Sequence, residues 1–263
     1  MIVARKRFGQ HFLHDQGIIR RIVQTVAPQS GEAVVEIGPG RGAITRPLLA
    51  ACGKLDAVEI DRDLIALLRH ANPPLEGLTV HEADVLRFDF RALAQARGVP
   101  LRVVGNLPYN ISTPLIFHLL DQVDAIADMH FMLQREVVER MAAAPGGGDY
   151  GRLTVMLAAQ VEVIPLFHIA PGSFTPPPRV DSAFVRLVPH AVAPFTVPDP
   201  ALYARVVAAA FGQRRKTLRN TLKNLADEAQ IRAVGLDPGL RPEQISPAEY
   251  AALAAHLRTD AGQ

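Results

Sequence analysis

The chain has 263 residues, of which 49% are hydrophobic and 21% charged. This composition excludes a largely disordered chain, and no apolar run reaches the roughly 18 residues that a membrane-spanning helix requires. The net charge of +2 is too small to identify a partner. A single cysteine and the absence of a stretch resembling a signal peptide favour a cytoplasmic protein that is not attached to a membrane.

The first two thirds of the chain alternates short apolar runs with helix-like stretches, which is typical of a parallel sheet covered by helices on both faces. The predicted strands are residues 33–37, 55–60, 78–81, 101–104 and 128–133. The predicted helices between them are residues 44–51, 63–70, 90–96 and 113–120. Two later runs, 161–169 and 183–188, flank a proline-rich loop at 171–178 and predict an antiparallel hairpin at the sheet edge.

The character of the sequence changes near residue 189. A stretch with four prolines reads as a linker, and only helix-like segments follow it. Asp199-Pro200 and Ser246-Pro247 each place a capping residue before a proline at the first helical position. The sequence therefore predicts two domains, an α/β domain at 1–189 and a small all-helical domain at 190–263.

Glycines and acidic residues follow the first three predicted strands. The first strand ends in Glu36-Ile-Gly38-Pro-Gly40-Arg-Gly42, where glycines allow a tight turn and a close approach to a ligand. Glu59 ends the second strand, where its carboxylate can accept hydrogen bonds from ribose hydroxyls, and Asp84 follows the third, where it can meet the amino group of a base. Together they predict a pocket for a nucleoside without phosphates. A plain strand-to-helix turn is the alternative interpretation of the glycines.

Asn106-Leu-Pro108-Tyr109 follows the fourth predicted strand. The amino group of adenine is a poor nucleophile because its lone pair is delocalised into the ring. The Asn106 side-chain oxygen and the Pro108 carbonyl could accept its two hydrogens and direct the lone pair at an electrophile. Tyr109 would stack on the base, an interaction worth roughly 1–3 kcal/mol in comparable sites. A turn with a packed tyrosine is the alternative.

One segment of the helical region is strongly basic. Residues 211–224 contain no acid and five basic side chains: Arg214, Arg215, Lys216, Arg219 and Lys223. Without further information, a solvated helix face and a surface that binds phosphates explain this run equally well.

Several of these motifs, in this order along nearly the whole chain, resemble the ribosomal RNA adenine dimethyltransferases. The matching runs are Phe8-Gly-Gln-His-Phe-Leu13, residues 36–42, Glu59-Ile-Asp61, residues 106–109 and residues 174–182. The match is closest to the bacterial enzymes that dimethylate two adjacent adenosines near the 3′ end of 16S rRNA in the small ribosomal subunit or its precursor. The resemblance implies a Rossmann-like methyltransferase that uses S-adenosylmethionine and binds RNA through the basic run.

Carried over position by position, the resemblance implies specific roles. His11 and Leu13 would touch the cofactor, Gly38 its methionine end, Glu59 its ribose, Asp84 its adenine and Asn106 the region beside the sulfonium. The target base would be bound and oriented by four residues, Asn106, Pro108, Tyr109 and Phe174, with Phe174 stacking on the base opposite Tyr109. His11 stands where many members have asparagine. No metal is implied, and we expect a monomer.

Two other classes of function remain open at this point. A small-molecule or protein methyltransferase would share the cofactor fold, and motifs like residues 106–109 also occur in DNA adenine and glutamine methyltransferases. An RNA-binding assembly factor or a transcription factor would keep the fold without needing catalysis. The sulfonium loses its charge during methyl transfer, so we expect alignment and desolvation, rather than a general base, to supply most of the acceleration.

Overall fold

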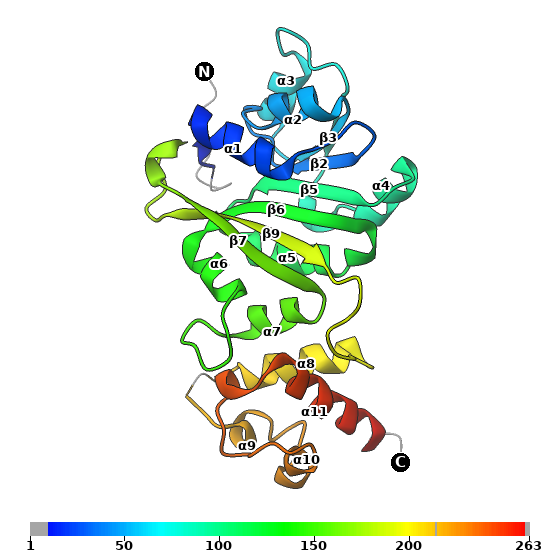
Figure 1. The fold of residues 1–263 in the computed structure, drawn as a ribbon, viewed down its shortest axis with the longest axis vertical. Helices are drawn as coiled ribbons and strands as arrows, with labels where there is room; N and C mark the ends of the chain where they lie inside the picture. Colours follow the sequence, from blue (N-terminus) through cyan, green and yellow to red (C-terminus); the bar gives the residue numbers. More distant parts are fainter. Residues whose placement is uncertain (1–9, 214, 261–263) are drawn as a thin grey trace. The chain divides into compact units, whose positions relative to one another are not determined.

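The computed structural model describes residues 10–213 and 215–260, which divide into two compact units (Figure 1). The first unit comprises the described residues through Val138 together with Ile164–Pro189, and the second comprises Glu139–Val163 with the described residues from His190 onward. The boundary predicted at 189/190 coincides with one of the three places where the chain passes between units. Residues 139–163, which the sequence analysis assigned to the first domain, belong to the second compact unit. That 190–263 is a domain of its own stays a prediction.

A seven-stranded sheet forms the centre of the first unit, in the order β4-β3-β2-β5-β6-β9-β7. Its strands are β2 (Ala33–Ile37), β3 (Leu55–Glu59), β4 (Leu78–Glu82), β5 (Leu101–Asn106), β6 (Ile126–Gln134), β7 (Val161–Ile169) and β9 (Ser182–Pro189). The first five pair in parallel, and β9 pairs antiparallel with β6. The predicted mixed, Rossmann-like sheet is confirmed, with β9 inserted between β6 and the edge strand β7.

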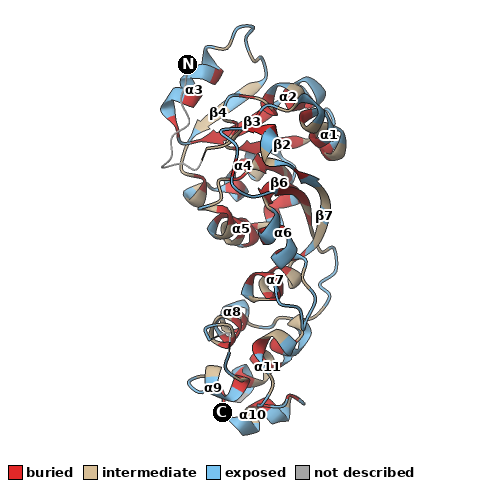
Figure 2. Cartoon of the chain, turned by 90° about the vertical axis from the view of Figure 1, so that its left-hand side faces the viewer, coloured by how far each residue is buried: buried red, intermediate tan, exposed pale blue. Residues whose placement is uncertain are grey.

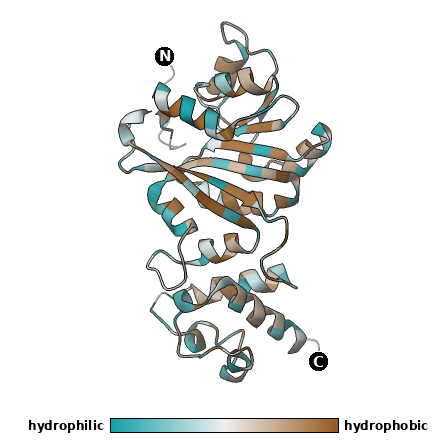
Figure 3. Ribbon diagram, in the orientation of Figure 1, coloured by the Kyte–Doolittle hydropathy of each residue, from teal (hydrophilic) through white to brown (hydrophobic). Residues whose placement is uncertain are grey.

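Helices of the first unit bury apolar stripes against this sheet. They are α1 (Gln16–Val26), α2 (Thr45–Cys52), α3 (Arg62–Arg69), α4 (Phe90–Arg97) and α5 (Ser112–Leu120), followed by α6 (Arg135–Met141), which runs into the second unit. One core cluster combines side chains of α1 and α2, such as Ile22 and Leu48, with side chains of the strands, such as Val104 and Phe184. Because successive strand residues face opposite ways, the buried Val103 and Phe131 serve the other face. The central strands β2, β5 and β6 are accordingly mostly apolar and buried, whereas most residues of β4 and β7 are not buried (Figures 2 and 3).

Two very short strands form a separate antiparallel sheet that the sequence analysis did not predict. β1 (Phe12–Leu13) pairs with β8 (Phe174–Thr175), with Phe12 opposite Thr175 and Leu13 opposite Phe174. Two residues carry no periodic pattern, so the pairing could not be found from hydrophobicity. Helix α1 also went unpredicted, although Asp15 caps it by accepting hydrogen bonds from the backbone N–H groups of Gly17 and Ile18.

The second unit is helical apart from the start of β7. Its helices are α7 (Arg152–Ala158), α8 (Pro200–Ala210), α9 (Leu218–Thr221), α10 (Glu228–Ala233) and α11 (Pro247–Asp260). The predicted caps are confirmed: the Asp199 side chain accepts from Leu202 N, and Ser246 Oγ accepts from Glu249 N. Three buried tyrosines, Tyr150, Tyr203 and Tyr250, each donate to a main-chain carbonyl within this unit. Among the described residues, no helix is long and apolar enough to cross a membrane.

Candidate active site

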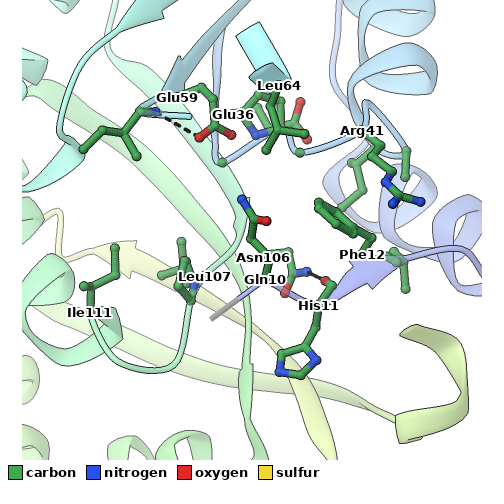
Figure 4. Close-up of a pocket in the computed structure, with 18 of the residues that line it drawn as sticks. Gln10, His11, Phe12, Glu36, Arg41, Glu59, Leu64, Asn106, Leu107 and Ile111 are labelled. Atoms are coloured by element: carbon green, nitrogen blue, oxygen red, sulfur yellow. Dashed lines mark hydrogen bonds between the residues drawn. The ribbon is translucent and has the colours of Figure 1, made fainter. Parts of the chain in front are cut away.

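The carboxyl ends of β2, β3 and β5 meet at one edge of the sheet, because these neighbouring strands are parallel. Ligands of open α/β sheets bind at this edge. A pocket opens here between the loops after these strands and the N-terminal segment at residues 10–13 (Figure 4). It brings together seven of the residues predicted to act in a site: His11, Leu13, Gly38, Glu59, Asn106, Pro108 and Tyr109.

The glycine loop after β2 takes a backbone conformation that favours glycine. Gly38, Gly40 and Gly42 have φ angles of 65°, 57° and 82°. A Cβ at Gly40 would also lie 3.3 Å from a ring carbon of Phe12, which packs directly over the loop. Because these glycines have no side chains, the loop leaves room for the N-terminal segment and lets a ligand contact its main chain.

Glu59 is held at the floor of the pocket with its carboxylate oriented by main-chain donors. Its Oε1 accepts hydrogen bonds from Ile60 N and Asp61 N, each at 2.9 Å, and the labelled Glu59 is drawn in Figure 4. The side chain is 7% exposed. Burial raises the pKa of Glu59, although the N–H groups of Asp61, Ile60 and Gly40 favour the ionised form. A carboxylate fixed in this way is suited to accept hydroxyl hydrogens from a ligand.

Glu36 is a pocket residue to which the sequence analysis assigned no role. It lies near the end of β2, is 2% exposed, and its Oε2 has no hydrogen-bond partner among the described residues. Burial, and secondarily the charge of Glu59, raise the pKa of Glu36 to about 7. Interaction with the Thr45 side chain lowers the pKa of Glu36 and only partly offsets these effects. A buried carboxylate oxygen without a partner, beside a pocket, is a candidate acceptor for a positively charged ligand group. Its signal in the sequence was an acid inside an otherwise apolar strand.

Replacing Glu36 by glutamine should stabilise the ligand-free protein at alkaline pH. Because the folded-state pKa is raised from 4.5 to about 7, the folded protein holds this proton more tightly than the unfolded chain. The stability linked to Glu36 is present below pH 4.5 and is lost as the pH rises through 7. At about 1.4 kcal/mol per pKa unit, the loss amounts to roughly 3 kcal/mol at most.

Chemical denaturation of the parent and Glu36→Gln at pH 5 and pH 8 measures this effect. The variant should gain stability relative to the parent at pH 8 and little or none at pH 5. Glu82→Gln, an exposed glutamate at the end of β4, is the matched control and should show no such pH-dependent difference. An equal difference between parent and Glu36→Gln at both pH values would contradict the assignment.

Asn106 is fixed by the N-terminal segment. Its Nδ2 donates a hydrogen bond to the main-chain oxygen of His11 at 2.9 Å, so Oδ1 is the atom left to serve as an acceptor in the pocket. The preceding Gly105 lets the end of β5 lie close to β2, because a Cβ there would lie 2.8 Å from the Ile37 carbonyl. The Pro108 carbonyl already accepts from Ile111 N at 3.1 Å, which leaves its second lone pair for a ligand.

Two further interactions hold the N-terminal segment against the pocket. The Arg41 guanidinium lies 4.4 Å from the centroid of the Phe12 ring (Figure 4). Gln10 Nε2 donates to Asp61 Oδ2 at 3.2 Å. The segment thus covers the glycine loop from one side and the loop after β3 from the other. Ile60, which is 49% exposed, and Leu64 add apolar surface to the same pocket.

Asp84 and Phe174 do not line the pocket. The Asp84 side chain accepts from Leu86 N at 3.0 Å and caps the short 3-10 helix Val85–Arg87. Phe174 is 2% exposed and belongs to the core cluster that contains Leu13. Binding of adenine by Asp84 and stacking of a base on Phe174 stay predictions, and the latter requires the ring to leave this packing.

The basic run of the second unit is exposed but is not one continuous helix. Arg214 lies outside the described residues, whereas Arg215, Lys216, Arg219 and Lys223 are exposed. Among the described residues of the run, only Leu218–Thr221 is helical, and Leu218 and Leu222 are buried. Arg219 lies 3.9 Å from Glu228, and the phosphate-binding role of the run stays a prediction.

No cluster of three or more histidine, cysteine, aspartate or glutamate side chains suited to a metal ion is present among residues 10–213 and 215–260.

The sheet and the loops at its carboxyl edge define a Rossmann-like methyltransferase. Residues 1–258 match the ribosomal RNA adenine dimethylase family, and the chain belongs to that family. A "Ribosomal RNA small subunit methyltransferase A" from Pseudomonas putida is 57% identical over 257 residues, covering 97% of this chain and 95% of the relative. A protein of the same name from Thiobacillus denitrificans is 57% identical over 259 residues, covering 98% and 100%.

Solved structures agree with this membership. A dimethyladenosine transferase from Plasmodium falciparum is 25% identical with a TM-score of 0.78, over 95% of this chain and 98% of that one. The 23S rRNA methyltransferase ErmE is 26% identical with a TM-score of 0.71, over 94% and 99%. The family and the fold class predicted from the sequence are confirmed.

Proposed function

We propose that this protein transfers methyl groups from S-adenosylmethionine to the exocyclic amino groups of two adjacent adenosines near the 3′ end of 16S rRNA, in the cytoplasm, during biogenesis of the small ribosomal subunit. The observation that carries the proposal is the shared pocket. It places the Asn106 amide, with Oδ1 available as an acceptor, beside a glycine loop and an oriented carboxylate. The names of the curated relatives support the small-subunit substrate.

The pocket fits the proposed cofactor in charge and in shape. Glu59 is positioned to accept from ribose hydroxyls, and Oε2 of Glu36, which has no hydrogen-bond partner among the described residues, matches a positively charged group. Gly38 and Gly40 allow main-chain approach, and Ile60 and Leu64 offer apolar surface to a base. S-adenosylmethionine supplies an electrophilic methyl group when it is bound.

The protein's own residues act on the target adenosine. Asn106 Oδ1 and the Pro108 carbonyl accept the two amino hydrogens, which draws the nitrogen toward tetrahedral character and directs its lone pair into the pocket. Tyr109 offers a ring on which the base can stack. To enter the pocket, the base must first leave its stack in the RNA, which costs a few kcal/mol for a paired base and less for a base in a loop. After transfer the surplus amino proton passes to solvent, and no side chain is assigned as a base.

Mass spectrometry of reacted RNA tests the proposal. Purified protein is incubated with labelled S-adenosylmethionine and ribosomal subunits from cells that lack the modification. Dimethyladenosine at two adjacent positions near the 3′ end of 16S rRNA is the expected result. Label confined to 23S rRNA would indicate a large-subunit methyltransferase instead, and RNA binding without label would favour an assembly factor.

Removing the Glu59 carboxylate should weaken cofactor binding. Glu59→Ala takes away the acceptor for the ribose hydroxyls, and we expect a loss of roughly 1.5–3 kcal/mol in calorimetric titration, as for hydrogen bonds to a charged group. Glu82→Ala is the matched control, because Glu82 pairs with Glu59 in register on the neighbouring strand but lies outside the pocket. Unchanged cofactor affinity in a folded Glu59→Ala protein would refute the assignment.

A further inference from the structure

His11 connects the two loops that surround the candidate base site. Its main-chain oxygen accepts the 2.9 Å hydrogen bond from Asn106 Nδ2. Its Nδ1 lies 2.7 Å from the main-chain oxygen of Pro176. Its ring stacks on Tyr109, with 5.6 Å between ring centroids and 26° between ring planes. His11 therefore contacts Asn106 at the end of β5, Tyr109 in the loop after β5, and Pro176 in the proline-rich loop.

The pairing of β1 with β8 explains how His11 reaches Pro176. Phe12 lies opposite Thr175 and Leu13 opposite Phe174, so in this antiparallel register His11 falls opposite Pro176. A second link joins the same two regions, because Tyr109 Oη and Ser182 Oγ are 2.9 Å apart. Contacts therefore join His11 to Tyr109, Tyr109 to Ser182, and His11 to the proline-rich loop that precedes Ser182.

The chemistry of the bond to Pro176 defines which imidazole nitrogen donates. A main-chain carbonyl only accepts, so Nδ1 must carry the hydrogen in this interaction. The bond fixes the ring, and the ring fixes the position of the residue 11 peptide whose oxygen orients Asn106. In Figure 4 the imidazole points away from Glu36 and Glu59 and lies on the far side of Asn106 from them.

We propose that His11 is a positioning residue for the methyl-acceptor site: its bond to Pro176 and its stack on Tyr109 hold the main-chain oxygen that sets the orientation of the Asn106 amide. This departs from the role in cofactor binding that the sequence resemblance implied for the His11 side chain. The kinetic part of the inference rests on the proposed function. Its structural part does not, since it concerns interactions within the protein without substrate.

Three variants separate the ring, its hydrogen bond and a general loss of structure. His11→Ala removes both interactions. His11→Phe keeps a ring for Tyr109 but has no donor for Pro176. His11→Asn has no ring, but its Nδ2 is bonded to Cγ, as Nδ1 of histidine is, and can donate to the Pro176 carbonyl. His14→Ala, an exposed histidine just beyond β1, is the matched control.

The first measurement is the pair of Asn106 side-chain amide resonances in ¹⁵N-labelled protein without substrate. We expect them to shift in His11→Ala and His11→Phe and to keep their parental positions in His11→Asn and His14→Ala. The second is single-turnover methyl transfer to small ribosomal subunits. The rate should fall about 10- to 100-fold in His11→Ala, as for small misplacements of a catalytic group, and His11→Asn should restore most of it. The cofactor dissociation constant should change less than about twofold, since no group that binds the cofactor is removed.

Three results would overturn the inference. These are parental Asn106 resonances in His11→Ala, a loss confined to cofactor affinity, and a parental rate in His11→Phe together with a low rate in His11→Asn. If the parent protein does not methylate small subunits, the proposed function fails, and the resonance measurement still decides the role of His11.

Discussion

Asn106→Ala should reduce single-turnover methyl transfer by about 10²- to 10³-fold, the loss typical of removing one preorganised hydrogen-bonding group from an active site. The reason is geometric. Asn106 Oδ1 is the side-chain acceptor that the 2.9 Å bond from Nδ2 to His11 leaves available in the pocket. Without it, the amino group of adenine keeps its planar, delocalised form. Rapid mixing of saturating protein and cofactor with limiting RNA isolates this step from RNA binding and product release.

Tyr109→Ala provides the contrast for this experiment. Loss of the ring should raise the RNA concentration required for half-maximal rate while affecting the chemical step less, because stacking contributes roughly 1–3 kcal/mol per base to capture. Cofactor titration and thermal unfolding of both variants verify that the pocket and the fold are retained. A folded Asn106→Ala protein that methylates at the parental rate would show that the amide does not activate the amino group.

The second large effect is expected from the basic run of the helical unit. Replacing Arg215, Lys216 and Lys223 by alanine removes three exposed positive charges that form no ion pair with the described residues, whereas Arg219 lies near Glu228. If each binds a phosphate, the slope of log affinity against log salt should flatten by about 0.7 to 0.9 for every phosphate left without its basic partner. The measurement is binding of an RNA fragment carrying the 3′ end of 16S rRNA across a salt series.

A charge-matched variant controls for net charge in this experiment. Arg205, Arg241 and Arg258 are exposed arginines of the same unit outside the run, and their replacement by alanine lowers the net charge equally. This control should keep most of the parental salt slope. Cofactor affinity should be unchanged in both variants, because the pocket lies wholly within the first unit. If the slope of log affinity against log salt is the same for the parent and the basic-run variant, the run is a solvated surface that does not bind phosphates.

Strand positions could be predicted closely because their signal is local. Residues 33–37 and 161–169 coincide with β2 and β7, and the remaining sheet strands differ by at most two residues at either end. Each run is rich in apolar residues over four to nine positions, and β2 and β6 are buried over almost their whole length, as expected for central strands covered on both faces. The placement of Gly38, Glu59 and Asn106 at one pocket followed, since parallel neighbouring strands bring their carboxyl ends to the same edge.

Other features depended on interactions between residues far apart in the chain. Phe174 lies in a loop-like, proline-rich sequence, yet pairing of β8 with β1 buries its ring beside Leu13. Residues 139–163 precede the predicted linker, yet Tyr150 and Val155 complete the core that α8 and α11 form. In both cases the deciding factor is burial against a distant partner, which no local window of sequence contains.

The sequence by itself determined the alternation of strands and helices, the family, and the residues at the ends of the strands, because periodicity, capping and turn residues act over a few neighbouring positions. Only the tertiary structure decided which atoms those residues present. It directs Asn106 Nδ2 to His11, so that Oδ1 is the acceptor, and it leaves Glu36 Oε2 buried with no partner among the described residues, which raises the pKa of Glu36 to about 7. Hydrogen bonding and desolvation depend on surroundings assembled from segments as distant as residues 11 and 106, and those surroundings exist only once the chain has folded.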